Sequence, residues 1–80
     1  MNFNTLKELI EFFVVKLTDK PELIKIIKIE SDEKNILEIR VASQDVPRLI
    51  GKEGRTFKSL QSMINLLSDT KIELVIESIL

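Results

Sequence analysis

The stretch Leu49-Ile50-Gly51-Lys52-Glu53-Gly54-Arg55-Thr56 joins two segments with helical periodicity near the middle of the chain. It holds both glycines of the 80-residue sequence, three positions apart. Glycine tolerates a positive φ and lets another backbone come close, because it has no Cβ. One basic residue lies inside the turn and another follows it directly. This pattern predicts a tight turn between two helices that another backbone can approach.

The composition describes a folded chain with few of the groups that catalysis uses. Hydrophobic residues make up 44% of the sequence and charged residues 31%, as in globular proteins. Eighty residues correspond to one domain, residues 1–80. The absence of cysteine and histidine excludes a disulfide framework, a zinc ribbon, a thiol nucleophile and a histidine base. We therefore expect no enzyme, no metal site, no cofactor and no small-molecule substrate.

Charge and hydropathy also limit where the protein is expected in the cell and which partners it is expected to bind. No apolar run approaches the roughly 18 residues that cross a bilayer, and the first residues lack a signal-peptide pattern. We expect a cytoplasmic protein without a membrane partner. The formal net charge is −1, yet Gln44–Ser68 carries +2 from four basic and two acidic side chains. The positive charge therefore gathers around the glycine turn.

The first half of the chain predicts one helix and two strands. Thr5 and Glu8 have the spacing of a capping box, so a helix is expected to open there and to end before Pro21. Strands are expected over Ile24–Glu30 and Ile36–Val41, with a polar hairpin turn between them. The apolar residues of the helix lie on one face, and those of the second strand alternate with charged residues: Leu6, Leu9, Ile10, Phe13, Val14 and Leu17, then Leu37, Ile39 and Val41.

The second half predicts two helices around the turn and a third strand. Ser43 or Asp45 can cap a short helix that ends near Ile50. An apolar stripe then continues through about Ser68, and alternation resumes over 72–77. The order α-β-β-α-α-β predicts an α+β, two-layer fold in which three helices cover one face of a three-stranded sheet.

This order, with the glycine turn between its fourth and fifth elements, resembles the type II KH fold. The size and the motifs resemble the small bacterial single-KH proteins of the KhpA (YlqC) family, over nearly the whole chain. The similarity is most specific in Val41-Ala42-Ser43-Gln44-Asp45-Val46 and in the Ile-Gly-Lys-x-Gly-Arg turn at 50–55.

The resemblance implies a protein that binds single-stranded RNA, as an RNA chaperone or post-transcriptional regulator. It also implies a homodimer or a heterodimer with a KhpB (Jag, EloR) type KH protein. The Gly51-Lys52-Glu53-Gly54 loop would clamp the phosphate backbone, since KH modules hold about four nucleotides in this way. Lys52 and Arg55 would supply charge directly, and Arg48 and Lys58 at longer range. The bases would lie in an apolar groove with Val46, Leu49 or Ile50 on one wall and Ile39 or Val41 on the other.

One position of the turn departs from the KH pattern. The middle of such turns seldom carries an acidic residue, and Glu53 places a carboxylate beside the expected path of a phosphate. We therefore expect this side chain to reduce the affinity for RNA.

Several other interpretations remain open at this stage. The two glycines can end a helix and form a tight turn without any ligand. The chain can be a protein-interaction module with a KH fold and marginal RNA affinity, since its net charge is negative. Residues 43–67 can also form a DNA-binding helix-turn-helix, although strands on both sides fit KH better.

Overall fold

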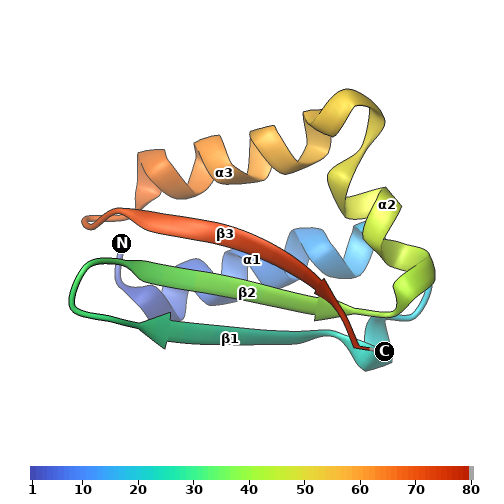
Figure 1. Cartoon of the computed structure of the whole chain (residues 1–80), viewed down its shortest axis with the longest axis horizontal. Coiled ribbons are helices and arrows are strands. Elements are labelled where there is room, and N and C mark those ends of the chain that lie inside the picture. The colour runs from blue at the N-terminus through green and yellow to red at the C-terminus, as the bar shows by residue number, and fades with distance from the viewer. Residues whose placement is uncertain (80) are drawn as a thin grey trace.

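A computed structural model describes residues 1–79, and its elements follow the predicted order α-β-β-α-α-β (Figure 1). Three one-turn 3₁₀ segments connect them, at Pro21–Leu23, Ser43–Asp45 and Lys52–Gly54. The helices and strands are α1 (Phe3–Leu17), β1 (Lys25–Glu30), β2 (Asn35–Val41), α2 (Val46–Ile50), α3 (Arg55–Leu67) and β3 (Ile72–Ser78). The predicted α+β fold class is confirmed.

Helix α1 begins two residues before the predicted capping box. The side-chain oxygen Oδ1 of Asn2 accepts a hydrogen bond from the backbone N–H of Thr5 at 2.9 Å, and the first helical residue is Phe3. Asparagine is as good an N-cap as a hydroxyl residue, so the prediction that Thr5 caps the helix is wrong. At the other end the Thr18 hydroxyl donates to the carbonyl of Val14 at 3.0 Å, which satisfies one terminal carbonyl.

The three strands form one mixed sheet in the order β1-β2-β3. β1 and β2 are antiparallel neighbours joined by a hairpin, with Ile26 opposite Ile39. β3 pairs with β2 in the parallel sense, with Ile76 opposite Ile39. A parallel neighbour needs a long connection, and here α2, the glycine turn and α3 supply it. The turn therefore lies inside the connection that joins β2 to β3.

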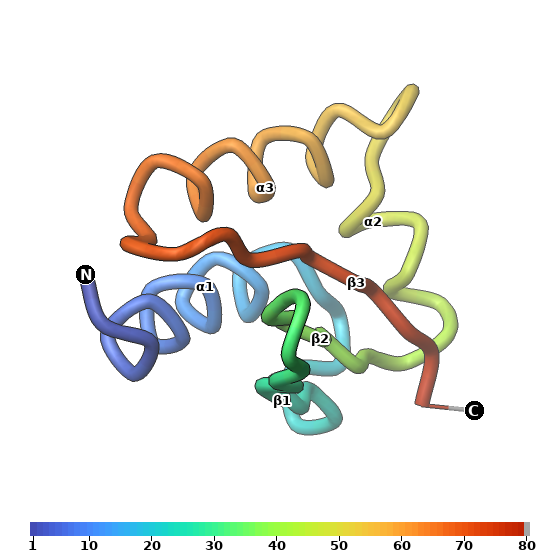
Figure 2. Tube along the Cα trace, turned by 60° about the vertical axis from the view of Figure 1, so that its left-hand side comes forward, coloured from blue at the N-terminus to red at the C-terminus, as the bar shows by residue number. Residues whose placement is uncertain are grey.

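All three helices bury their apolar stripes in one core on a single face of the sheet. Figure 2 shows α1 and α3 running beside the strands, while α2 and the turn project at one end. In β1 only Ile26 is buried, and Ile29, on the open face, is 40% exposed. The core residues are Leu6, Ile10, Val14, Ile26, Leu37, Ile39, Val41, Leu49, Leu60, Ile64, Ile72 and Leu74.

A buried carboxylate ties the start of α2 to the end of α1. Asp45 has no exposed surface, and its two oxygens accept the backbone N–H groups of Asp19 and Lys20 at 3.0 and 3.1 Å. Arg48 adds an ion pair to Asp19 at 2.7 Å, and its Nε lies 3.7 Å from Asp45. Asp45, one of the two predicted caps, does occupy the N-cap position of α2, but its side chain makes no capping hydrogen bond there. The Asp45 carboxylate is used by the α1–β1 connection instead.

Within residues 1–79, none of the helices has the length and the hydropathy needed to cross a membrane. The same residues contain no cluster of three or more histidine, cysteine or acidic side chains that could hold a metal ion.

The first prediction concerns the Asp45 bridge. Replacing Asp45 by alanine leaves two backbone N–H groups without an acceptor, so we expect a loss of about 2–4 kcal/mol in the free energy of unfolding. Asp45→Asn keeps one acceptor oxygen and should lose roughly half as much. Urea unfolding followed by circular dichroism measures both variants, with the exposed neighbour change Gln44→Ala as the control. Equal midpoints for Asp45→Ala and the control would contradict the structural role of the carboxylate.

Candidate functional site

The glycine turn adopts a backbone conformation that its two glycines make accessible. Gly51 ends α2 with φ +76° and ψ 175°, and its N–H donates to the Pro47 carbonyl at 2.8 Å. Gly54 precedes α3 with φ +73° and ψ 17°, and its N–H donates to the Gly51 carbonyl at 3.1 Å. Both residues lie in the region of positive φ that side chains disfavour. The turn is thus a folded loop with its own hydrogen bonds.

Gly51 is required for a second reason, which is space. A Cβ atom at this position would fall on the hydroxyl oxygen of Thr56 and lie 2.9 Å from the Thr56 backbone nitrogen. At Gly54 the nearest atom to such a Cβ is Cε of Lys58 at 3.8 Å, an ordinary contact. Any side chain at position 51 would therefore push the first turn of α3 away, whereas position 54 requires only the positive φ.

Glu53 has a positive φ without being glycine. Its φ of +57° and ψ of 24° place it in the left-handed helical region, which costs a non-glycine residue roughly 1–2 kcal/mol. The Glu53 carboxylate lies 3.5 Å from Nη2 of Arg55, and both side chains are largely exposed. An exposed pair of this kind contributes little to stability. Arg55 therefore remains available to another anion that displaces Glu53.

The four predicted cationic residues differ in whether they already form an ion pair with an acidic side chain. Lys52 and Lys58 are exposed, and neither makes an ion pair within the part of the chain that the structure describes. Arg48 is already paired with Asp19 and lies beside Asp45. The 13-residue helix α3 begins directly after Gly54 without a side-chain cap, so the positive end of its dipole faces the turn. Positive potential thus comes from Lys52, Lys58 and the start of α3, more than from Arg48.

The predicted apolar groove residues separate into two groups. Ile50 is 41% exposed beside the turn, and Val46 is half-buried at the start of α2. Leu49, Ile39 and Val41 have no exposed surface at all and belong to the core. In this conformation they have no surface with which to touch a ligand, and they support α2 and the turn from below. Ile50 and Val46 remain the accessible apolar surface next to the glycines.

Two further residues matter that were not among the predicted site residues. Thr56 fills the space that the missing Cβ of Gly51 leaves open. Gln61 joins α3 to the outer edge of β3, through hydrogen bonds to the Ile72 carbonyl at 2.9 Å and the Leu74 N–H at 2.8 Å. Both residues were part of an ordinary polar helix pattern in the sequence. No local signal distinguishes a polar side chain that contacts a neighbouring strand from one that faces water.

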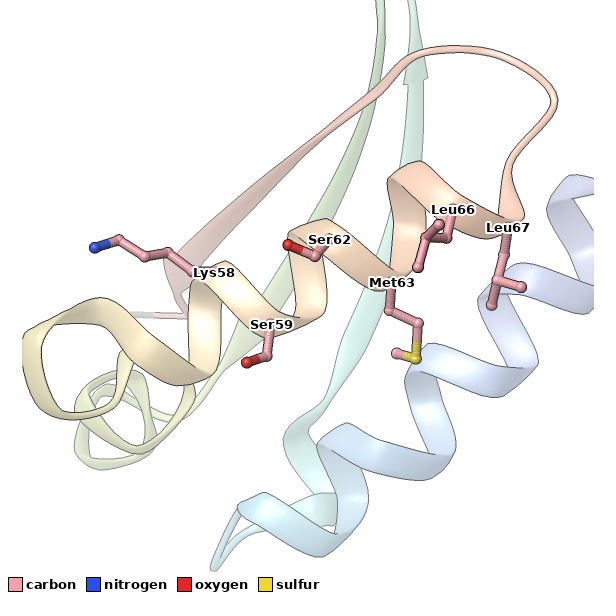
Figure 3. Close-up of a pocket in the computed structure, with 6 residues that line it drawn as sticks. All are labelled: Lys58, Ser59, Ser62, Met63, Leu66 and Leu67. Atoms are coloured by element: carbon pink, nitrogen blue, oxygen red, sulfur yellow. The ribbon is translucent and has the colours of Figure 1, made fainter.

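Three apolar residues of α3 reach the surface to different extents: Leu66 is exposed, whereas Met63 and Leu67 are half-buried against the core. Leu66 is 84% exposed, and in Figure 3 Met63 and Leu67 point toward α1. Together with Lys58, Ser59 and Ser62 these residues line a shallow hollow of about 470 Å³ (Figure 3). This surface lies on α3 itself, so the helix that begins at the glycine turn also presents an apolar side.

Comparisons with known proteins place these features in a family. Residues 7–76 match the family described as KhpA/KhpB, KH domain. An RNA-binding protein KhpA from Thermotoga maritima is 33% identical over 72 residues, covering 90% of this chain and 96% of that protein. The RNA-binding protein KhpA of Borreliella burgdorferi is 40% identical over 57 residues, with coverage of 71% and 70%. That of Bacillus subtilis is 37% identical over 59 residues, with coverage of 74% and 73%.

The search among solved structures found no match. The relatives are named as RNA-binding proteins and not as enzymes, which agrees with the prediction that this chain is not an enzyme. The matched region contains α2, the glycine turn and α3 in full. The chain therefore belongs to the KhpA/KhpB family of KH-domain proteins.

Proposed function

We propose that residues 1–80 act as a single KH domain that binds single-stranded RNA in the cytoplasm, as an RNA chaperone or post-transcriptional regulator. The observation that carries this proposal is the turn itself. Gly51 and Gly54 hold positive φ values beside the exposed Lys52, at the uncapped start of a 13-residue helix. The names of the family's relatives support RNA as the ligand.

The turn would hold the phosphodiester backbone. With no Cβ at Gly51 or Gly54, a phosphate can approach the loop more closely than it could approach ordinary residues. Lys52 supplies a full positive charge and the start of α3 a partial one. Arg55 can leave Glu53 for a phosphate and then make a bidentate contact, because guanidinium matches the geometry of two anionic oxygens.

The bases would lie against the accessible apolar surface next to the turn. Ile50 and Val46 provide that surface. Ile39, Val41 and Leu49 are not part of the proposed contact set, since they are fully buried. The described residues include phenylalanine as their only aromatic type, so we do not propose recognition by stacking on aromatic side chains.

A second function, pairing with another KH protein, is favoured by one specific observation. Leu66 is 84% exposed on α3, next to the half-buried Met63 and Leu67. Apolar groups gathered on one helix face are typical of interaction surfaces. The partner would be a second copy of this chain or a KhpB-type protein, in keeping with the family description.

The prediction for the clamp is a loss of RNA affinity in Lys52→Asp. Reversing the charge at the turn replaces attraction for a phosphate by repulsion, so we expect affinity to fall at least about tenfold. Fluorescence anisotropy with a labelled pool of single-stranded RNA hexamers measures the effect, and circular dichroism checks the fold. Lys25→Asp, an equal charge change at the exposed first residue of β1, is the control and should change affinity less than about twofold. Equal losses in both variants would contradict a specific role for the turn.

The prediction for Glu53 separates charge from backbone strain. Glu53→Gln removes only the carboxylate and should tighten RNA binding about two- to fivefold, because Arg55 and the phosphate lose a competing anion. Glu53→Gly should give the same gain and also add about 1 kcal/mol to the free energy of unfolding, because glycine adopts the positive φ without strain. Anisotropy and urea unfolding measure the two effects. Unchanged RNA affinity in Glu53→Gln would show that the carboxylate lies away from the phosphate path.

The prediction for the α3 surface concerns the molar mass in solution. Light scattering should show a mass that rises toward twice that of one chain as the concentration increases. Leu66→Lys should return the mass to that of a monomer without lowering stability, because the side chain is exposed. Leu23→Lys, an exposed leucine in the segment Pro21–Leu23, is the matched control. A monomer at every concentration, or a dimer that Leu66→Lys leaves intact, would rule out pairing through this face.

A further inference from the structure

The side-chain amide of Gln61 occupies part of the free edge of the sheet. β3 is the last strand in the order β1-β2-β3, so no strand formed by residues 1–79 lies beside its outer edge. Gln61 Nε2 donates to the Ile72 carbonyl at 2.9 Å, and Gln61 Oε1 accepts from the Leu74 N–H at 2.8 Å. These two groups flank residue 73, and a residue of a parallel neighbouring strand would bind the same pair. One amide therefore takes the place of a strand at this point of the edge.

Both polar atoms of the Gln61 amide make hydrogen bonds within the protein, which distinguishes this residue from an ordinary surface glutamine. Its Nε2 also donates to Oδ1 of Asn65 at 3.1 Å, one helical turn further along α3. Most exposed polar side chains bind water, yet this one is half-buried and its bonds reach across to another element. Edge strands in proteins are usually covered or blocked. Gln61 blocks this one through side-chain hydrogen bonds, which can break without unfolding the strand.

Gln61 lies on the flank of α3 that leads away from the glycine turn. Lys58, Gln61 and Asn65 follow one another at spacings of three and four, so they share one side of the helix. Gln61 is seven residues from Gly54, or about 10 Å along the helix axis. Nucleotides spaced by at least about 3.4 Å cover this distance within the four that a KH module holds.

A hollow opens beside Gln61 at the end of α3 away from the turn. Its volume is about 590 Å³, and its lining includes Gln61, Asn65 and Ile72. Lys34 at its rim is paired with Glu73 at 3.0 Å, whereas Lys71 makes no ion pair within the described residues. The hollow thus combines amide groups and the strand edge with two basic and two acidic side chains, Lys34, Lys71, Glu33 and Glu73.

We propose that Gln61 is a displaceable stand-in for a nucleobase, and that a base of the bound RNA competes with it for the Ile72 carbonyl and the Leu74 N–H. The Watson–Crick edge of every base holds a hydrogen-bond acceptor next to a donor, and a primary amide holds the same pair. A base that enters the α3–β3 seam can therefore replace both bonds while the Gln61 side chain turns into the hollow. Gln61 then sets the affinity for bases, separately from the phosphate clamp. This inference rests on the proposed RNA-binding function.

The test compares two RNA probes on three proteins. The probes are a labelled single-stranded hexamer of mixed sequence and a hexamer of the same length with abasic riboses. The proteins are the natural chain, Gln61→Met and the control Ser62→Ala, whose exposed side chain makes no hydrogen bond to β3 within residues 1–79. Methionine keeps the length of the side chain but cannot bind the strand edge. We expect Gln61→Met to bind the base-containing hexamer about three- to tenfold more tightly and the abasic hexamer unchanged.

The outcomes separate this inference from the proposed function. If the natural chain binds the hexamer and Lys52→Asp does not, the clamp stands and Gln61→Met decides the role of the amide. Equal or weaker binding by a folded Gln61→Met would overturn the inference alone. If the natural chain binds neither probe, both proposals fail.

A second measurement covers the case in which Gln61→Met does not fold. In the natural chain, titration with the base-containing hexamer should shift the NMR signals of the Gln61 side-chain amide and the Leu74 N–H. The abasic hexamer should leave both signals in place. Shifts that are absent with the base-containing hexamer, or equal with both probes, would overturn the inference.

Discussion

The contact between Gly51 and Thr56 is the constraint on which the arrangement of the site depends. A Cβ at position 51 would overlap the Thr56 side chain, so the first turn of α3 packs directly against the end of α2. That close approach fixes the direction in which α3 leaves the turn. The direction of α3 in turn determines where its apolar stripe meets the sheet, and where β3 begins. A conformational property of one residue thus links the loop geometry to the core.

The less exposed polar groups and the exposed charged groups near the turn have different roles. Asp45 and Gln61 make hydrogen bonds to backbone groups of neighbouring elements. Lys52 and Lys58 project into solvent at the same end of the molecule without partners among residues 1–79. An anion-binding loop needs cations that the fold positions without neutralising them. Lys52 and Lys58 meet this need.

The fold was predictable from the sequence because its signals are periodic and local. The alternation in Leu37, Ile39 and Val41 and the glycines at 51 and 54 predict the elements that the structure contains. Periodicity gives the face on which a side chain lies but not its depth below the surface. For that reason Ile39 and Val41 were expected at a groove wall, although they are fully buried.

The capping hydrogen bonds were mispredicted because several short polar residues compete for the backbone groups near each helix start, and only the tertiary contacts decide between them. The place of the turn within the topology also has a consequence for how the protein folds. The β1–β2 hairpin and α1 involve neighbouring residues, whereas β3 reaches β2 only after Ala42–Lys71 has closed into a loop. Closing such a loop costs entropy before any strand pairing is gained, so it is expected late in folding. The residues proposed to hold RNA thus lie in the connection whose closure completes the sheet, and a ligand bound to the folded form would stabilise that closed state.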